Sequence, residues 1–253
     1  MISARPASWH DAGVADVVVF IPAWNEEENL PAVLAELRGE LPDVDVLVVD
    51  DGSTDGTAEV ARAHGAEVDS LGTNQGLRYG IAAGYRWALD HNYAYCGRVD
   101  ADGQHPPQEL ARLLELVRSG EYDVAVGSRF VSGDGYAPYR YKPSGARRFG
   151  TAVLRRAMKL VLGRPFGDAT SGLYAVNAKA LPLLAETFAS GAPEVEALIR
   201  VTDAGLKLGE IPVTMEARAS GESKLRGSKA VKLVVTVAGT LVAAKIVRSR
   251  LKS

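Results

Sequence analysis

An α/β fold with a mostly parallel sheet flanked by helices is the fold class that this 253-residue sequence predicts. Runs of β-branched residues alternate with segments of helical periodicity through the first half of the chain, as in sheets covered by helices. The first run, residues 14–21, is continuously apolar, as expected of a strand buried on both faces. Hydrophobic residues make up 47% and charged residues 24% of the chain, so disordered, collagen-like and coiled-coil proteins are excluded.

The expected elements follow one another regularly over the first 127 residues. Strands, each a short apolar run, are predicted at residues 14–21, 44–49, 66–69, 96–99 and 123–127. Helices, each with apolar residues on one side, are predicted from Asn29 onward and at residues 54–64, 80–89 and 108–117. Pro31 suits the first turn of the first helix, because an N–H group there has no helical partner. Because strand and helix alternate, we expect the strands to be mostly parallel.

The regular alternation stops after Gly127. Residues 128–150 are rich in Gly, Tyr and Arg, residues 217–227 are polar and cationic, and both are predicted to be loops with a binding role. Further helices and strands are predicted at residues 151–162, 173–176, 180–186, 195–204 and 207–213. The chain is therefore divided into one domain, residues 1–227, and a C-terminal amphipathic and basic segment, residues 228–253.

The C-terminal segment allows several interpretations. Its apolar stripe and terminal Lys and Arg residues fit an amphipathic helix resting on an anionic membrane surface. They also fit a helix packed on the core or across a dimer interface, and the Val-rich stretch allows a strand. The longest apolar run, residues 233–244, is shorter than the ~20 residues that span a bilayer.

The expected location is the cytoplasm, with peripheral contact at the inner face of the membrane as an alternative for the C-terminal segment. Residues 1–13 lack the apolar run of an export signal. The single cysteine, Cys96, cannot form an internal disulfide and is expected to be a structural thiol. The net charge of −2 gives no basic footprint, so no nucleic-acid partner is expected.

Two carboxylates follow the strand predicted at residues 96–99. Asp100 and Asp102 are two positions apart and would point to the same side if the chain stays extended. Carboxylates this close repel each other unless a cation lies between them, and Mg²⁺ binds through one or two carboxylates plus substrate phosphates. The sequence therefore predicts a divalent-metal site, with a plain acidic turn before the next helix as the alternative.

Two further acidic turns follow the first two predicted strands. Asp50 and Asp51 open the segment 50–57, in which Ser53, Thr54 or Asp55 could alternatively cap the next helix. Residues 22–28 carry three glutamates, which could alternatively favour a helix N-terminus. Because ligands bind beyond the carboxyl ends of strands in open parallel sheets, the three turns should converge on one site.

In this order, the motifs resemble the family 2 glycosyltransferases of the nucleotide-sugar-binding GT-A fold. The matching blocks are PAWNEEENL (22–30), VDDGSTDGT (49–57), DADGQHPP (100–107), GSRF (127–130), DATSG (168–172) and GESKL (221–225). The last three blocks look most like the dolichyl-phosphate mannose synthase branch, whose members move a sugar from a nucleotide diphosphate to a polyprenyl phosphate. The resemblance covers roughly residues 15–226.

The resemblance implies a role for each matching residue on the donor side. Residues that would line the nucleotide pocket are Pro22, Ala23, Trp24 and Glu26, with Trp24 where the family usually has Tyr. Asp50 would bind the base and Asp51 the nucleoside side of the donor. Asp100 and Asp102 would hold Mg²⁺ or Mn²⁺ on the diphosphate of a GDP- or UDP-sugar, with Gln104 completing the site.

The resemblance also implies an acceptor side. Arg129 would face an acceptor phosphate, helped by loop residues Arg140, Ser144, Arg218, Ser223 and Lys224. A phosphate monoester is largely dianionic at pH 7 and needs no general base. If the acceptor were instead a sugar hydroxyl of a glycan or small molecule, a carboxylate base would be required, and Glu194 and Glu196 are the candidates. Both could alternatively be ordinary acids in the first turn of a helix.

The predicted activity is an inverting, metal-dependent transfer of a sugar to a polyprenyl phosphate, as in cell-envelope glycan biosynthesis. Transfer to a sugar hydroxyl remains the alternative reaction, and a nucleotide-sugar-binding module without turnover is the non-enzyme alternative. The presence of Asp100, Asp102 and Arg129 argues against the non-enzyme alternative. Peripheral contact with the membrane, or with a membrane-protein partner, is a further expectation from the sequence.

Overall fold

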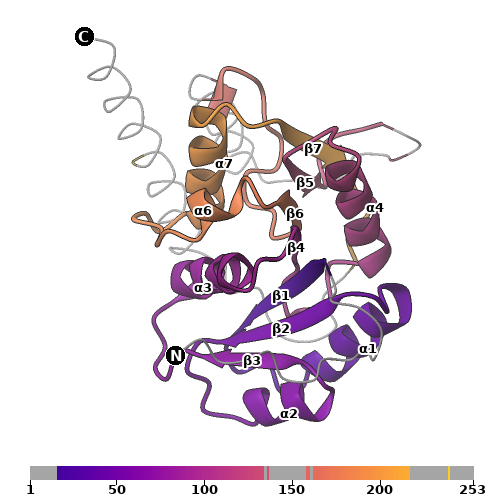
Figure 1. Cartoon of the computed structure of the whole chain (residues 1–253), viewed down its shortest axis with the longest axis vertical. Coiled ribbons are helices and arrows are strands. Elements are labelled where there is room, and N and C mark those ends of the chain that lie inside the picture. Colours follow the sequence, from indigo (N-terminus) through magenta and orange to yellow (C-terminus); the bar gives the residue numbers. More distant parts are fainter. Residues whose placement is uncertain (1–15, 134–135, 137–157, 160–161, 217–238, 240–253) are drawn as a thin grey trace, which may run out of the picture.

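A seven-stranded open sheet with helices on both faces forms the body of the computed structural model (Figure 1). The structure describes residues 16–133, 136, 158–159, 162–216 and 239. The strands are β1 (Val17–Ala23), β2 (Asp45–Asp50), β3 (Glu67–Ser70), β4 (Tyr95–Arg98), β5 (Val124–Ser128), β6 (Tyr174–Asn177) and β7 (Leu208–Pro212). The helices are α1 (Leu30–Glu40), α2 (Thr57–Ala63), α3 (Leu77–Asp90), α4 (Pro107–Arg118), α6 (Leu181–Leu184) and α7 (Pro193–Asp203).

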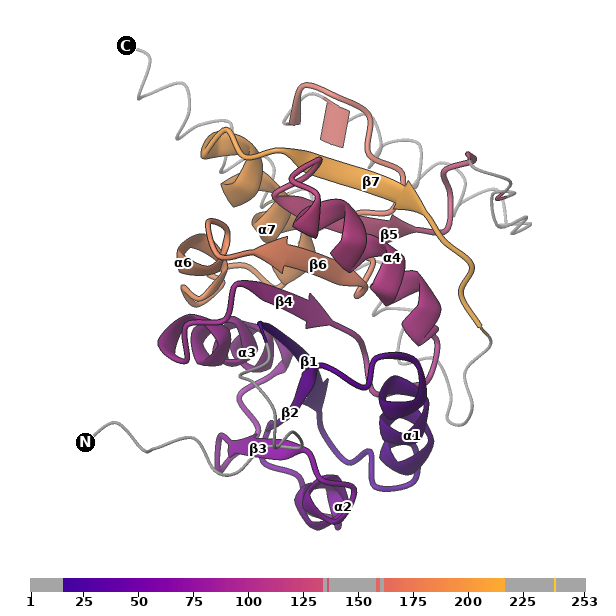
Figure 2. The same ribbon diagram turned by 45° about the vertical axis from the view of Figure 1, so that its right-hand side comes forward.

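The sheet order is β3-β2-β1-β4-β6-β5-β7. Every neighbouring pair is parallel except those made by β6, which runs antiparallel to both β4 and β5 (Figure 2). The predicted mostly parallel α/β fold is therefore confirmed. The chain places β2 and β3 on one side of β1 and then crosses to place β4 on the other side. Such a switch point, at the carboxyl ends of the strands, is where open sheets bind ligands.

The sheet is buried on both faces, as its continuous apolar strands predict. Along β1, Val18 and Phe20 belong to a core under α3, α6 and α7, whereas Val19 and Ile21 belong to a core under α1, α2 and α4. Figure 1 shows these two helical layers on opposite sides of the sheet. Gly84 lets α3 approach β1 closely, because a Cβ atom there would lie 2.2 Å from the Phe20 ring.

The first residues of two helices differ from the prediction, because side chains in neighbouring turns accept hydrogen bonds from backbone N–H groups there. Helix α2 begins at Thr57 rather than residue 54, because the N–H groups of Thr54 and Gly56 bond to side chains of the preceding turn. Helix α3 begins at Leu77 rather than residue 80, because Asp51 satisfies the N–H groups just before it. These hydrogen bonds cannot be predicted from the hydrophobic periodicity of the sequence.

Several predictions fall on residues outside those that the structure describes. They concern most of the loops at 128–150 and 217–227, most of the helix at 151–162, and the C-terminal segment from residue 228 apart from residue 239. Among the described residues, no helix is long and apolar enough to cross a membrane.

Candidate active site

The turns after β1 and β2 are joined by hydrogen bonds between side chains and backbone. Ser53 Oγ accepts from the Asn25 N–H group at 3.0 Å, and Asn25 Oδ1 accepts from the Thr54 N–H group at 2.8 Å. A carboxylate oxygen of Glu27 accepts from the Gly56 N–H group at 2.7 Å. The first two predicted turns therefore form one rigid unit, as their convergence requires.

Asp50 and Asp51 lie inside this unit and shape it. Asp51 accepts the N–H groups of Gln75 and Gly76 at 2.7 and 2.8 Å, one on each oxygen, at the start of α3. Asp50 accepts from the Ser53 N–H group at 2.9 Å and from the Ser70 hydroxyl at 2.7 Å. Burial alone raises the pKa of Asp50, but these hydrogen bonds bring it below its ordinary value of 3.8. These contacts hold both carboxyl groups in one orientation.

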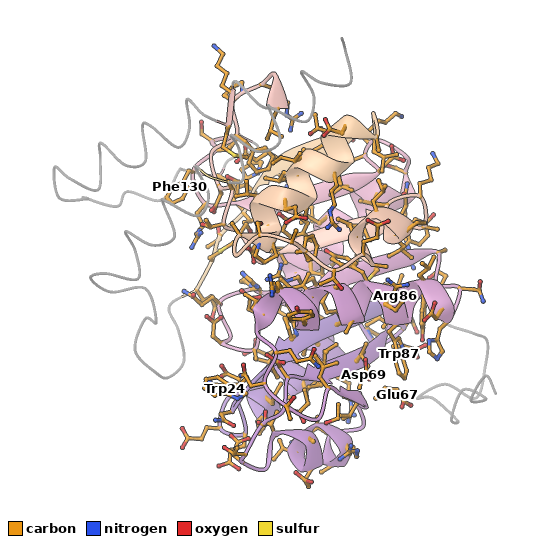
Figure 3. The ribbon with its side chains drawn as sticks, turned by 90° about the vertical axis from the view of Figure 1, so that its left-hand side faces the viewer. Trp24, Glu67, Asp69, Arg86, Trp87 and Phe130 are labelled. Carbon is orange, nitrogen blue, oxygen red and sulfur yellow. The ribbon has the colours of Figure 1, made fainter. Side chains whose placement is uncertain are left out.

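The other predicted nucleotide residues lie along the end of β1. Pro22 and Ala23 are strand residues, and the Ala23 carbonyl accepts from the Asp51 N–H group at 2.9 Å. Glu26 accepts from the Asn29 side chain at 2.7 Å. Trp24 is 42% exposed, and Figure 3 shows it near one edge of the molecule. An exposed indole face at this position is suited to contact with a planar ligand.

The capping alternative for the second turn holds in part. Asp55 Oδ1 accepts from the N–H group of Thr57, the first residue of α2, at 3.1 Å. The residue at the N-cap position itself is Gly56, without a side-chain cap. Asp55 thus serves the helix start, while Asp50 and Asp51 hold the neighbouring strand and helix.

Asp100 and Asp102 lie in the turn between β4 and α4. Strand β4 ends at Arg98, so the extended alternation expected for the two aspartates stops before Asp100. They nevertheless act on the same neighbour, since both raise the pKa of Arg129, after the larger effect of Asp168. A Cβ atom at Gly172 would lie 2.2 Å from an Asp100 carboxylate oxygen, so only glycine leaves that carboxylate its space.

Gln104 and His105 stabilise this turn. The Gln104 N–H group donates to Asp102 Oδ1 at 3.1 Å, and its side chain donates to the Glu216 carbonyl at 3.2 Å. His105 Nδ1 accepts from the Asp100 N–H group at 3.0 Å. Burial lowers the pKa of His105 despite the nearby aspartates, so the ring is neutral with its proton on Nε2. His105 is a site residue that was not predicted, and its position within the DADGQHPP block is the signal that could have identified it.

Arg98, at the end of β4, connects this turn to α7. Its Nη2 atom lies 3.2 Å from Asp100 Oδ1 and 3.1 Å from Glu194 Oε1. The arginine side chain is 2% exposed and that of Glu194 is 14% exposed. No local sequence pattern predicts the role of Arg98, because its partner Glu194 is 96 residues away.

The structure separates the two candidate glutamates. Glu194 points to Arg98, whereas Glu196 accepts from the Ala189 and Ser190 N–H groups at 3.2 and 2.8 Å and pairs with Arg200 at 2.7 Å. Burial alone raises the pKa of Glu196, but these contacts bring it below its ordinary value of 4.5. Glu196 therefore holds the chain before α7, and its lowered basicity and engaged oxygens disfavour a general base there.

Arg129 follows β5 and is held by Asp168. Nε and Nη2 of the guanidinium lie 2.7 and 2.8 Å from the two carboxylate oxygens of the fully buried Asp168. Glu210 on β7 fixes the aspartate in turn, because it accepts the N–H groups of Gly167 and Asp168. The Arg129 side chain remains 29% exposed. The result is a rigid, partly exposed cation beside the Asp100–Asp102 turn.

The carboxylates of this turn fit a divalent cation whose other ligands come from a bound substrate. Among the described residues no cluster of three or more His, Cys, Asp or Glu could enclose a metal. Two carboxylates at a strand exit, with Asp100 given room by Gly172, instead match the way Mg²⁺ binds through one or two carboxylates and substrate phosphates. The remaining predicted acceptor residues, Arg140, Ser144, Arg218, Ser223 and Lys224, lie outside the described residues.

The fold is that of the GT-A glycosyltransferases. The chain is similar to a crystal structure of glucosyl-3-phosphoglycerate synthase from Mycobacterium tuberculosis in complex with Mn²⁺, uridine diphosphate and phosphoglyceric acid. The TM-score is 0.65 with 20% sequence identity, covering 94% of this chain and 84% of that one. A second structure of the same synthase, with Mg²⁺ and uridine diphosphate, gives a TM-score of 0.62 at 21% identity, covering 94% of this chain and 85% of that one.

The chain belongs to glycosyl transferase family 2, whose family model matches residues 18–181. It is 36% identical to undecaprenyl-phosphate mannosyltransferase from Micrococcus luteus over 87% of this chain and 92% of that protein. It is 32% identical to polyprenol monophosphomannose synthase from Mycolicibacterium smegmatis over 92% of this chain and 89% of that protein. The resemblance inferred from the motifs is confirmed, and the chain is a glycosyltransferase.

Proposed function

We propose that this protein transfers a mannosyl residue from a nucleotide-diphosphate sugar to a polyprenyl phosphate, with inversion at the anomeric carbon. The names of the two relatives describe mannosyl transfer to polyprenyl carriers, and both match nearly their whole length. The observation that carries the proposal is the rigid Arg129–Asp168 pair beside the Asp100–Asp102 turn. It supplies an oriented cation where an anionic acceptor would meet the donor.

On the donor side, the joined turns after β1 and β2 hold the nucleoside. Trp24 offers a planar surface, and Asp50 and Asp51 present fixed acceptors for N–H and O–H groups. Asp100, Asp102 and Gln104 would hold the Mg²⁺ or Mn²⁺ that accompanies the donor diphosphate. A divalent cation there neutralises the charge that develops on the leaving diphosphate, without any proton transfer.

On the acceptor side, the phosphate monoester is its own nucleophile. One of its oxygens attacks the anomeric carbon while the bond from that carbon to the diphosphate breaks, and the diphosphate leaves with the electron pair. Arg129 orients the acceptor by charge-assisted hydrogen bonds. Arg140, Ser144, Arg218, Ser223 and Lys224 complete the acceptor site in this proposal, and Glu216, two positions before Arg218, already contacts Gln104.

Transfer to a sugar hydroxyl is less well supported, because that reaction requires a free carboxylate base. Glu194 pairs with Arg98, and Glu196 pairs with Arg200 and backbone N–H groups. The contacts of Glu196 also lower its pKa, which makes it a weaker base. The acceptor phosphate needs no such group.

A polyprenyl acceptor also brings the enzyme to a membrane surface. We propose that the protein acts at the inner face of the membrane through peripheral contact, with the basic segment 228–253 as the contact region. Its cations would lie at anionic headgroups, an attraction that salt screens. Truncation before Ala230 should then reduce cosedimentation with anionic vesicles and leave nucleotide binding unchanged.

The decisive experiment compares acceptors and donors with the full-length protein. GDP-mannose and UDP-sugars are tested with a short polyprenyl phosphate and with a panel of sugar acceptors, in Mg²⁺, Mn²⁺ and chelator. We expect metal-dependent transfer to the lipid phosphate, with the acidic limb of kcat/KM following the acceptor's own ionisation near pH ~6. Arg140→Ala should raise the acceptor KM and leave nucleotide affinity unchanged. Transfer to sugars alone, abolished by Glu194→Gln or Glu196→Gln, would overturn the proposal.

A further inference from the structure

A single guanidinium nitrogen bridges two carboxylates behind the proposed metal turn. Arg98 Nη2 lies 3.2 Å from Asp100 Oδ1 and 3.1 Å from Glu194 Oε1. The arginine is 2% exposed, so its charge is shared between these two neighbours rather than with water. Asp100 is 36% exposed and forms the outward end of this chain of charges, while Glu194 forms the inward end.

Stability alone does not account for this arrangement. Burying an ion pair costs several kcal/mol of hydration per ion, and an apolar replacement of similar volume is often as stable. The pair is also incompletely satisfied, because Arg98 Nε and the hydroxyl of the adjacent Tyr174 are buried without a hydrogen-bond partner among the described residues. Apolar side chains fill the surrounding core. A buried arginine kept under these conditions points to a role at the exposed end of the chain of charges.

Among the described residues, the acids and arginines that interact around the turn carry a formal excess of two negative charges. Four carboxylates and two guanidinium groups interact there, namely Asp100, Asp102, Asp168, Glu194, Arg98 and Arg129. That excess equals the charge of one divalent cation, and it includes the contribution of Glu194.

We propose that Glu194 and Arg98 are positioning residues for Asp100: Arg98 fixes the Asp100 carboxylate, and Glu194 offsets the arginine charge so that Asp100 keeps its attraction for the divalent cation. This inference rests on the proposed function, because it concerns the metal that accompanies the donor. It gives Glu194 a role in donor binding that differs from the general base predicted by sequence. Removal of its charge should leave the arginine acting on Asp100 alone and weaken cation binding.

The test measures how Mn²⁺ supports nucleotide binding in the full-length protein. Isothermal titration of GDP and of UDP is carried out over a series of Mn²⁺ concentrations, and thermal unfolding checks the fold. Glu194→Gln keeps the shape and hydrogen-bond acceptor but removes the charge, and we expect a roughly tenfold higher Mn²⁺ requirement, in line with changes around metal ligands. Nucleotide binding in chelator should not change.

A second variant distinguishes electrostatic positioning from a merely structural role. Arg98→Met combined with Glu194→Gln removes both charges and the buried unpaired Nε, so Asp100 no longer faces an uncompensated cation. We expect the Mn²⁺ requirement to return to within about threefold of wild type, because the two changes couple through one contact. Glu115→Gln is the matched control, since it removes the same charge from an exposed position on α4.

The outcomes test the positioning role of Glu194 and the proposed function separately. An unchanged Mn²⁺ requirement in Glu194→Gln overturns the inference, as does a defect that the added Arg98→Met change does not reverse. Loss of turnover in Glu194→Gln with normal Mn²⁺-dependent binding would make Glu194 a general base and also overturn it. If wild-type protein shows no metal-dependent nucleotide binding, the proposed function fails first, independently of either variant.

Discussion

The two sides of the candidate site are built by different forces. The turns after β1 and β2 are joined by hydrogen bonds from backbone N–H groups to side chains such as Ser53 and Asn25. Around β4 and β5, the buried Arg98 instead pairs with Asp100 and Glu194, and the partly exposed Arg129 pairs with the buried Asp168. The donor side is therefore held by many modest contacts. The reacting side depends on a few charges, each of which is costly to leave unpaired.

The largest effect should follow from removing a charge on the reacting side. Asp102→Asn keeps the shape of the turn and its acceptor for the Gln104 N–H group, but weakens attraction for the divalent cation. We expect a loss of kcat/KM of about 100-fold or more, because a bound cation supplies several kcal/mol to the transition state. Steady-state kinetics in Mg²⁺ measure the loss, and a normal unfolding curve shows that the fold survives. Unchanged turnover would remove Asp102 from the metal site.

Breaking the Arg129–Asp168 pair tests how much one buried charge matters to stability. Asp168→Asn should lower the free energy of unfolding by about 2–3 kcal/mol, somewhat below the cost of fully buried pairs because Arg129 is partly exposed. Ser53→Ala on the donor side should cost about 1 kcal/mol. Urea denaturation compares the two variants. Equal losses would contradict the contrast drawn between the two sides.

Gly172→Ala tests the space reserved for Asp100. A Cβ atom there meets the end of the Asp100 side chain, so the carboxylate must move while the backbone keeps its conformation. We expect a roughly tenfold rise in the Mn²⁺ concentration needed for nucleotide binding, with stability nearly unchanged. Gly39→Ala is the control, because nothing lies within 4 Å of a Cβ at that helical position and the change should be neutral or slightly stabilising. Normal Mn²⁺ dependence in Gly172→Ala would show that the Asp100 position is not critical.

The smallest effect concerns acid stability through Glu196. Its pKa in the folded protein is below the ordinary 4.5, because hydrogen bonds from Ser190 and Ala189 and the pair with Arg200 outweigh burial. Folded protein therefore binds fewer protons than unfolded protein, so the stabilisation is present above pH 4.5 and is lost as the pH falls through the lowered pKa. Glu196→Gln should flatten this part of the stability profile, because glutamine does not bind a proton in this pH range. Denaturant unfolding at a series of pH values gives the comparison, and an unaltered acid slope would contradict the assignment.

Much of the fold could be predicted because each strand carries its own signal. The β-branched run of β1 can be recognised from its own residues, without knowing which strands lie beside it. The alternation of strand and helix then indicates a parallel sheet. The turns at Asp50, Asp51, Asp100 and Asp102 were predicted to converge because parallel strands end at one edge. The starts of α2 and α3 were misplaced because they depend on hydrogen bonds from neighbouring turns.

The fold class, the family and the acidic turns can be recognised in the amino-acid sequence, because those features reside in local patterns and short motifs. The roles of individual charges in these turns follow from the packing of distant elements. That packing paired Glu194 with an arginine 96 positions away and Arg129 with an aspartate 39 positions away, and it turned Glu196 toward the chain before α7. The physical reason is that a charge acts through distance and burial, and neither quantity exists before distant strands and helices pack together.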